Sequence, residues 1–253
     1  MAWTGRVALV TGAGGGIGRA VAEQLSAHGL RVALTSRNEA DLRATAAACG
    51  GETLVAPADV TDPTATESVF ADVERAWGPV EVLVANAGVG VSARVHKTSD
   101  EDWQRMLDLN LTAPFRCIRR VLPAMLEARF GRIVVVASVA AKAGQPYIAA
   151  YSASKHGVLG LVRSAAAEVA RDGVTVNAVC PGYVDTPMTD AAVAAITATT
   201  GRTPEEARDL LARKQPSGRL VTPEEVAAAV WFCVSNGAVN GQGVNVDAGA
   251  VQS

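Results

Sequence analysis

Short valine-rich runs alternate with longer helix-patterned segments along most of the chain, and this alternation limits the fold more than any other feature. The runs occupy residues 6–11, 31–36, 53–58, 80–86, 131–138, 174–179 and 243–247. Short runs that are apolar throughout are typical of parallel strands buried on both faces. The pattern therefore predicts an α/β fold, a doubly wound parallel sheet of about seven strands with helices on both faces.

The domain organisation follows from length and from one irregular segment. A single domain over 1–253 is expected, because α/β folds of this size need not divide and neither a repeat nor a linker interrupts the chain. Residues 187–218, after the sixth run, are polar and helix-prone. Ligands of such sheets bind beyond the carboxyl ends of the strands, so this segment is predicted to be a substrate lid. A further helix is expected over 223–235, whose opening "TPEE" supplies an N-cap threonine, a first-turn proline and early acids.

Charge and apolar content exclude several functional classes. Lys+Arg 23 against Asp+Glu 25 gives a formal net charge of -2, so the basic footprint of a nucleic-acid-binding protein is absent. No apolar run approaches the ~20 residues that span a bilayer, and the first glycines precede any signal-peptide core. We therefore expect a soluble, cytoplasmic protein with no membrane or nucleic-acid partner. Its cysteines lack metal-ligand spacing, which predicts reduced thiols and no metal site: Cys49, Cys117, Cys180 and Cys233.

A glycine-rich loop, "TGAGGGIG" at 11–18, joins the first expected strand to the first expected helix. In this context Gly12 permits the tight turn, Gly16 lets the backbone approach a pyrophosphate, and Gly18 lets the helix pack close to the sheet. Backbone N–H groups and the helix dipole then face the anion. The loop predicts a dinucleotide-binding site.

The stretch "YSASK" at 151–155 places a tyrosine and a lysine one helical turn apart. An ordinary polar face explains such a pair when it stands alone. The chemical interpretation is that Tyr151 exchanges a proton with a substrate oxygen. Its ordinary pKa of ~10 is too high for easy exchange near neutrality, so a cation such as Lys155 is needed to stabilise the phenolate. Ser138 ends a strand run, where its hydroxyl can help hold the substrate oxygen.

Five motifs in order resemble the short-chain dehydrogenase/reductase family, and the resemblance covers nearly the full chain. They are "TGAGGGIG" (11–18), "ADV" (58–60), "NAG" (86–88), "YSASK" (151–155) with Ser138 upstream, and "CPGYVDTPM" (180–188). The resemblance implies a Rossmann-type sheet, a nicotinamide dinucleotide cofactor and a homodimer or homotetramer formed by paired helices and the C-terminal segment. It also implies that Lys155 binds the nicotinamide ribose, and that the backbone of Asn110 holds a water linking Lys155 to solvent. The implied catalytic set is Asn110, Ser138, Tyr151 and Lys155.

The same resemblance assigns the cofactor contacts. The adenine would contact Asp59 and Val60, and the nicotinamide would lie near Pro181, Gly182 and Thr186. Taken singly, Asp59 is better explained as the cap of a turn and Asn86 as a residue that bonds sheet backbone. The full implied cofactor set is Gly12, Gly16, Ile17, Gly18, Ser36, Arg37, Asp59, Val60, Asn86, Gly88, Tyr151, Lys155, Pro181, Gly182, Val184 and Thr186.

Cofactor choice is predicted from "LTSRNE" at 34–39. In relatives that prefer NAD, an aspartate at the end of the second strand binds the adenosine ribose. Ser36 occupies that position here, and Arg37 can meet a 2'-phosphate through charge-assisted bonds. NADP(H) is therefore the expected cofactor, with NAD(H) the alternative.

The leading functional hypothesis is an oxidoreductase acting on a ketone or secondary alcohol, with Tyr151 as the acid/base. The chain looks most like the 3-oxoacyl thioester reductases, in which Arg129 matches a basic carrier-docking residue. Asp172 stands where those enzymes often place a second arginine, which favours a coenzyme A ester or a free small ketone. The alternatives are an oxidative secondary-alcohol, hydroxysteroid or polyol dehydrogenase and, from another class, a non-catalytic dinucleotide sensor.

Overall fold

Seven parallel strands form one sheet in the computed structural model, which describes residues 2–252. The order is β3-β2-β1-β4-β5-β6-β7, so the chain reverses direction across the sheet between β1 and β4. This confirms the predicted doubly wound sheet; the end residues 1 and 253 of the expected domain lie outside the described residues. The strands are β1 (Val7–Thr11), β2 (Arg31–Thr35), β3 (Thr53–Val55), β4 (Val82–Ala85), β5 (Gly131–Val136), β6 (Val174–Pro181) and β7 (Gly243–Val246).

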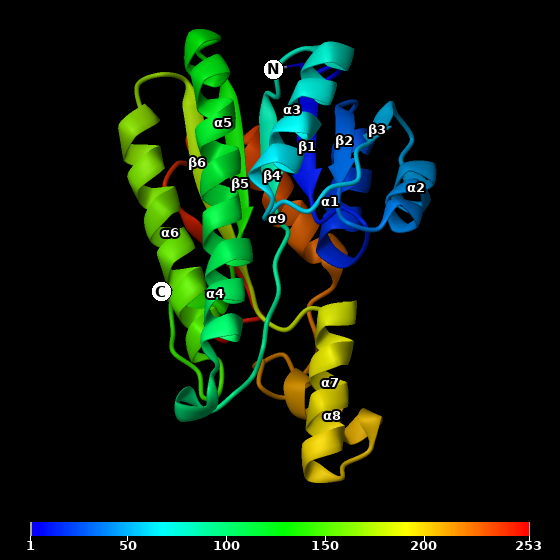
Figure 1. Cartoon of the computed structure of the whole chain (residues 1–253), viewed down its shortest axis with the longest axis vertical. Coiled ribbons are helices and arrows are strands. Elements are labelled where there is room, and N and C mark those ends of the chain that lie inside the picture. The colour runs from blue at the N-terminus through cyan, green and yellow to red at the C-terminus, as the bar shows by residue number, and fades with distance from the viewer. Residues whose placement is uncertain (1, 253) are drawn as a thin grey trace.

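Helices cover both faces of the sheet (Figure 1). They are α1 (Gly16–Ala27), α2 (Glu39–Ala48), α3 (Pro63–Trp77), α4 (Asp100–Leu107), α5 (Ala113–Glu127), α6 (Ala149–Val169), α7 (Pro187–Thr200), α8 (Pro204–Ala212) and α9 (Pro223–Ser235). α9 has the predicted bounds and begins with a capping box between Thr222 and Glu225. Within residues 2–252, none of these helices has both the length and the apolar character needed to cross a membrane.

The core divides into two layers because successive strand residues point to opposite faces. In β1, Val7 and Leu9 pack in the cluster formed with α3, α5 and α6. Ala8 and Val10 pack in the other cluster, with α1 and α9. All five β1 residues are buried, as expected of a central parallel strand.

The observed strands differ from the predicted runs mainly at their ends. β3 stops at Val55 rather than at residue 58. The backbone continues beside β2 nevertheless, since the N–H of Ala58 donates to the Ser36 carbonyl at 3.0 Å. β6 is longer than predicted because it pairs with β7 as far as Pro181 and Val246.

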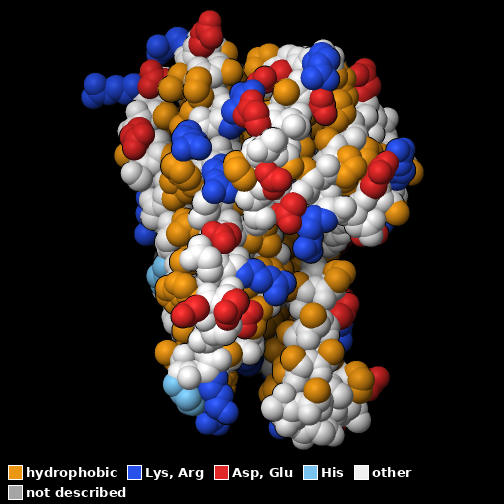
Figure 2. All heavy atoms as spheres, in the orientation of Figure 1, with side chains coloured by type: hydrophobic (Ala, Val, Ile, Leu, Met, Phe, Trp, Pro, Cys, Tyr) orange, Lys and Arg blue, Asp and Glu red, His pale blue; other side chains and the backbone are white. Residues whose placement is uncertain are grey.

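The predicted lid segment contains two helices, α7 and α8, which project beyond the carboxyl ends of the strands (Figure 1). They have their own small buried cluster of Val193, Ala207 and Leu211. Arg208 on α8 forms ion pairs with Asp185 and, at 2.8 Å, with Asp190. Figure 2 shows a cleft between this projecting pair and the neighbouring part of the molecule.

Candidate active site

The glycine loop lies at the carboxyl end of β1, where the sheet order reverses. Gly12 has a positive φ of 65°, and a Cβ there would lie 2.9 Å from the Ala87 Cα. A Cβ on Gly18 would lie 2.1 Å from the Gly12 carbonyl oxygen, so α1 approaches the loop more closely than any side chain allows. At Gly15, in contrast, an added Cβ meets nothing within 4 Å, and the loop is open on that side. These contacts fit a loop that offers its backbone to a phosphate.

The structure brings the loop beside two other predicted cofactor segments. A Cβ on Gly16, whose φ is 50°, would lie 3.0 Å from the Thr186 Cγ2. A Cβ on Gly14 would lie 3.0 Å from both the Ser36 hydroxyl oxygen and the Asp41 Cβ. Asp41, in the first turn of α2, was not expected at this edge.

Asn86 joins the loop to β4. Its side-chain amide donates to the carbonyls of Thr11 and Gly12 at 2.9 and 3.1 Å. The Thr11 hydroxyl in turn accepts the N–H groups of Asn86 and Ala87, both at 3.0 Å. The side chain of Asn86 therefore bonds strand and loop backbone, as expected from an asparagine that supports the central strands.

Arg37 is close enough to Asp59 to affect its pKa, but the side-chain contacts of Asp59 are those of a turn cap. Hydrogen bonds from the Thr61 hydroxyl and N–H hold the pKa of Asp59 below its ordinary value, and Arg37 contributes more weakly in the same direction. Asp59 thus caps the turn, while Arg37 is exposed. Asn38, next to Arg37 in the loop after β2, uses its side chain to cap α2.

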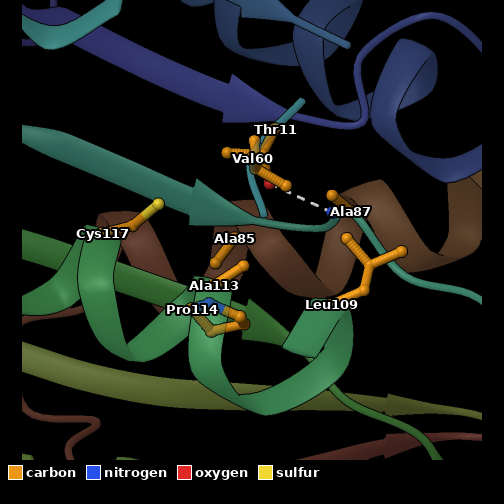
Figure 3. Close-up of a pocket in the computed structure, with 8 residues that line it drawn as sticks. All are labelled: Thr11, Val60, Ala85, Ala87, Leu109, Ala113, Pro114 and Cys117. Carbon is orange, nitrogen blue, oxygen red and sulfur yellow. Dashed lines mark hydrogen bonds between the residues drawn. The ribbon is translucent and has the colours of Figure 1, made fainter. Parts of the chain in front are cut away.

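Two predicted cofactor residues have buried side chains. Val60 is 6% exposed and lines a small pocket together with Ala85 and Ala113 (Figure 3). Val184 is 5% exposed and belongs to the core beneath α9. Ile17 is partly buried against that same core. Val60 and Val184 therefore expose little surface to a ligand.

Ser138 and Tyr151 meet at the carboxyl end of β5. Ser138 follows the strand by two residues and its hydroxyl accepts the Ala140 N–H at 3.1 Å. It is also hydrogen-bonded to the Tyr151 hydroxyl. The ring of Tyr151 faces Gly90, where an added Cβ would lie 3.7 Å from the ring carbons.

Lys155 lies one turn along α6 from Tyr151, and its Nζ is 5.7 Å from the centroid of the Tyr151 ring. The side chain is 4% exposed, and its ammonium donates to the Val136 carbonyl at 2.9 Å. Removal from water makes the charged form less favourable, which lowers the Lys155 pKa to about 8.

Tyr151 shifts in the direction opposite to the one that the Tyr/Lys pairing predicts. Burial is the main influence and raises the pKa of Tyr151, although the Ser138 hydrogen bond acts against it. In the free protein, desolvation of the phenolate therefore outweighs the hydrogen bond from Ser138. The arrangement keeps a protonated tyrosine in the site.

Asn110 connects α6 to the loop after β4. It lies in a π-helical turn, Asp108–Thr112, and its side chain bonds both the N–H and the carbonyl of Val89, at 3.0 and 2.9 Å. It also donates to the Ser154 hydroxyl at 3.1 Å. Gly88 lies next to both Asn110 and Lys155: a Cβ added to it would be 3.1 Å from the Asn110 side-chain oxygen and 3.6 Å from the Lys155 Nζ. All four predicted catalytic residues therefore belong to one neighbourhood.

The loop after β6 is held by a residue that no local pattern indicated. Gln215, 2% exposed, accepts the Tyr183 N–H at 2.9 Å and donates to the Tyr183 carbonyl at 3.2 Å. A Cβ on Gly182 would lie 2.2 Å from the Gln215 side-chain oxygen, and Pro181 ends the strand just before it. Only the "CPGYVDTPM" motif itself could have drawn attention to Tyr183.

Comparisons with known proteins agree with this geometry. The family model described as "short chain dehydrogenase" matches residues 6–196. A crystal structure of a variant of actinorhodin polyketide ketoreductase with NADPH superimposes with a TM-score of 0.93 at 41% identity, covering 97% of each chain. A levodione reductase structure gives a TM-score of 0.92 at 31% identity, again over 97% of each chain.

Among curated proteins, the 3-oxoacyl-(acyl-carrier-protein) reductase FabG of Escherichia coli strain K12 is 36% identical over 251 residues, with 98% of each chain covered. The match extends over the glycine loop, the Ser138–Tyr151–Lys155 neighbourhood and the segment after β6 alike. On these grounds the chain belongs to the short-chain dehydrogenase family.

Proposed function

We propose that the protein reduces a ketone to a secondary alcohol with NADPH, and that its substrate is a 3-oxoacyl thioester or a related small ketone. The observation that carries the proposal is the Ser138–Tyr151 hydrogen bond beside buried Lys155, two strands across the sheet from an open glycine loop. The names of similar proteins support it, since they include a polyketide ketoreductase crystallised with NADPH and a 3-oxoacyl reductase.

The loop contacts fit a dinucleotide, because the cradle near Gly12 and Gly16 leaves no room for side chains while Gly15 stays open. When bound, NADPH supplies the hydride for the reduction. The residues proposed to hold it are the loop glycines, Ser36 and Arg37, the turn at Asp59, and the backbone of the segment from Pro181 to Thr186.

Residues of this chain donate the proton that the reduced ketone needs and stabilise the charge left on the donor. Tyr151 donates its hydroxyl proton to the substrate oxygen as negative charge develops there, and Ser138 holds the same oxygen by a hydrogen bond. The phenolate that remains is stabilised by the Lys155 ammonium, 5.7 Å from the ring centroid. Asn110 lies in a π-helical turn, an irregularity that often occurs at functional sites, and this supports the proposed water path from Lys155 to solvent.

One surface ion pair bears on whether the substrate is carried on an acyl carrier protein. Arg129, the candidate carrier-docking residue, lies 3.9 Å from Asp172 and donates to the Arg171 carbonyl at 2.9 Å. A carboxylate beside this arginine weakens its attraction for an acidic carrier protein. We therefore favour a coenzyme A ester or a free small ketone over a carrier-bound acyl chain.

We also propose that the protein self-associates and that it acts in the cytoplasm. The supporting observation for self-association is the set of exposed large apolar side chains on the outer helices, including Trp103, Phe115 and Phe232. Such side chains are common at the interfaces of oligomers.

A spectrophotometric assay with a panel of ketones tests the function. The protein should consume NADPH with at least one 3-oxo ester or small activated ketone and form the alcohol. An alcohol dehydrogenase working oxidatively would instead show a higher kcat/KM with an alcohol and the oxidised cofactor than with any ketone of the panel and NADPH. Binding of NADPH without turnover of either panel would show a non-catalytic sensor and contradict the proposal.

A further inference from the structure

Gln215 is a buried glutamine that follows α8, and its side-chain amide reaches back to the loop after β6. The residue is 2% exposed, three positions beyond the end of α8 and 32 positions after the residue that it bonds. Burial of an amide costs free energy unless its polar atoms are hydrogen-bonded. The contacts of this side chain therefore decide what its burial contributes.

The Gln215 amide takes the place of a peptide group beside Tyr183. A parallel bridge already joins this loop to Val221, whose N–H donates to the Tyr183 carbonyl at 2.9 Å and whose carbonyl accepts the Asp185 N–H at 2.9 Å. The Tyr183 N–H donates to the Gln215 Oε1 at 2.9 Å. The Gln215 Nε2 donates to the carbonyls of Tyr183 and Arg219, at 3.2 and 2.5 Å. One side chain thus extends the bridge as another strand residue would.

Gly182 shows how closely the loop is held. A Cβ added to it would lie 2.2 Å from the Gln215 Oε1 on one side and 3.1 Å from the Asp247 Cβ on the other. Asp247 is 4% exposed, and its carboxylate accepts the N–H groups of Gly249 and Val251 at 3.0 and 2.8 Å. The loop after β6 is therefore fixed between the end of the predicted lid segment and the turn after β7.

The residues held in this way are those proposed to lie at the nicotinamide end of the cofactor, from Pro181 to Thr186. A loop that already has its bound conformation loses less conformational freedom when the ligand binds, and this raises affinity. The adenosine end is proposed to lie at Ser36 and Arg37 after β2, with β1, β4 and β5 between β2 and β6. Disorder in the loop after β6 should therefore weaken binding at one end of the cofactor.

We propose that Gln215 is a positioning residue, which holds the loop after β6 in the conformation that binds the nicotinamide end of NADPH. The inference rests on the proposed NADPH-dependent reduction and adds a residue that determines how tightly the reactive end of the cofactor is held. Because Gln215 belongs to the predicted lid segment, 187–218, it also links that segment directly to the cofactor loop.

The test compares the dissociation constants of NADPH and of adenosine 2',5'-bisphosphate, which has the phosphorylated adenosine end of NADPH and lacks the nicotinamide end. Gln215→Met keeps the length of the side chain and removes the amide, so the Tyr183 N–H loses its acceptor. In calorimetric titrations, the Kd for NADPH should rise about three- to tenfold, the effect of one lost hydrogen bond, and the Kd for the bisphosphate should stay at the parental value. Gln242→Met is the matched control and should change neither constant, since that exposed amide bonds only the nearby Asn240 carbonyl among the described residues.

Gln215→Glu adds a readout that a loss of packing would not change. An ionised carboxylate at this position has no proton to donate and faces the carbonyls of Tyr183 and Arg219, whereas a protonated carboxyl has one donor and one acceptor, as the amide does. Protonation should therefore restore the contact. The NADPH affinity of this variant, relative to the parent at the same pH, should recover as pH falls from about 8.5 to about 6.

The outcomes separate this inference from the function on which it rests. If the parent does not bind NADPH, the proposed function fails and the inference fails with it. If the parent binds NADPH and Gln215→Met changes both dissociation constants equally, or changes neither, Gln215 does not position the nicotinamide loop. If Gln215→Met does not fold, Gln215→Glu decides, and an affinity relative to the parent that is independent of pH overturns the inference. Neither of these last two results bears on ketone reduction itself, which the turnover assay tests.

Discussion

At the scale of single residues, the buried ammonium of Lys155 links stability to catalysis. Burial holds its pKa at about 8, below the ordinary 10.5, so the folded protein binds this proton less tightly than the unfolded chain does. Between these two values the unfolded state carries more protons, and stability rises with pH. Below about pH 8 Lys155 is charged in the folded protein, so its burial lowers the free energy of unfolding by the full amount. The folded site thereby keeps a positive charge at the expense of stability.

Lys155→Met should therefore change the pH dependence of stability. Relative to this variant, the parent should gain on the order of 3 kcal/mol in free energy of unfolding as pH rises from about 8 to 10.5. Denaturant unfolding of both proteins at several pH values measures the difference, in which groups common to both cancel. Lys97→Met is the control because that lysine is exposed. Parallel pH profiles for the parent and Lys155→Met would contradict the account.

Arg37 should determine cofactor preference. It is exposed beside Ser36 and influences Asp59, as a phosphate-binding arginine at the loop after β2 should, although the Asp41 carboxyl lies at the same edge. We expect the parent to prefer NADPH over NADH about ten- to hundredfold in kcat/KM, and Arg37→Ala to lose most of that preference. Arg43→Ala is the control, since Arg43 is paired with Glu39 at 2.9 Å. A parent that favours NADH would show the cofactor assignment to be wrong.

Residue-level prediction succeeds where a short motif carries the information. The one-turn spacing of Tyr151 and Lys155, and the serine at the end of a strand run, are visible in the sequence and lie together in the structure. The direction of the Tyr151 pKa shift is not visible, because it depends on burial by distant segments. Gln215 is not indicated by the sequence, because a long-range contact brings it to the loop after β6.

At the scale of elements, the strands were predictable because central parallel strands must be apolar on both faces. Their ends were less predictable: β3 stops at Val55, whereas the run was expected to continue to residue 58. The π-helical turn before α5 has only a faint signal in the nearby Pro114. The helical character of residues 187–218 follows from composition and caps, whereas its role as a lid stays a prediction.

The α7–α8 pair should move between free and bound states. Its separate core has only three buried apolar residues among those described, and Arg208 holds it mainly by exposed ion pairs, which contribute little stability in water. Amide hydrogen exchange in residues 187–218 should be faster in the free protein and slow when NADPH and a ketone are bound. α9, which packs on the main core, should exchange alike in both states. Equal protection of 187–218 with and without ligands would show a fixed element.

At the scale of the whole molecule, the surface indicates assembly. Trp103 on α4, Phe115 on α5 and Phe232 on α9 are each more than two-fifths exposed, at 42%, 41% and 46%. Sedimentation velocity at micromolar concentration should show a dimer or tetramer, and Phe115→Glu should shift the distribution to smaller species. Leu210→Glu on α8, at 37% exposure, is the control and should leave the distribution unchanged. A monomeric parent would refute self-association.

The most direct test of the central claim is turnover by Tyr151→Phe. This variant keeps the ring that faces Gly90 and removes only the hydroxyl bonded to Ser138. NADPH binding, followed by fluorescence titration, should stay close to that of the parent, while the rate of ketone reduction should fall by ~10²–10⁴-fold, the usual contribution of a general acid. Reduction at a rate near that of the parent would show that another group supplies the proton and that the proposed mechanism is wrong.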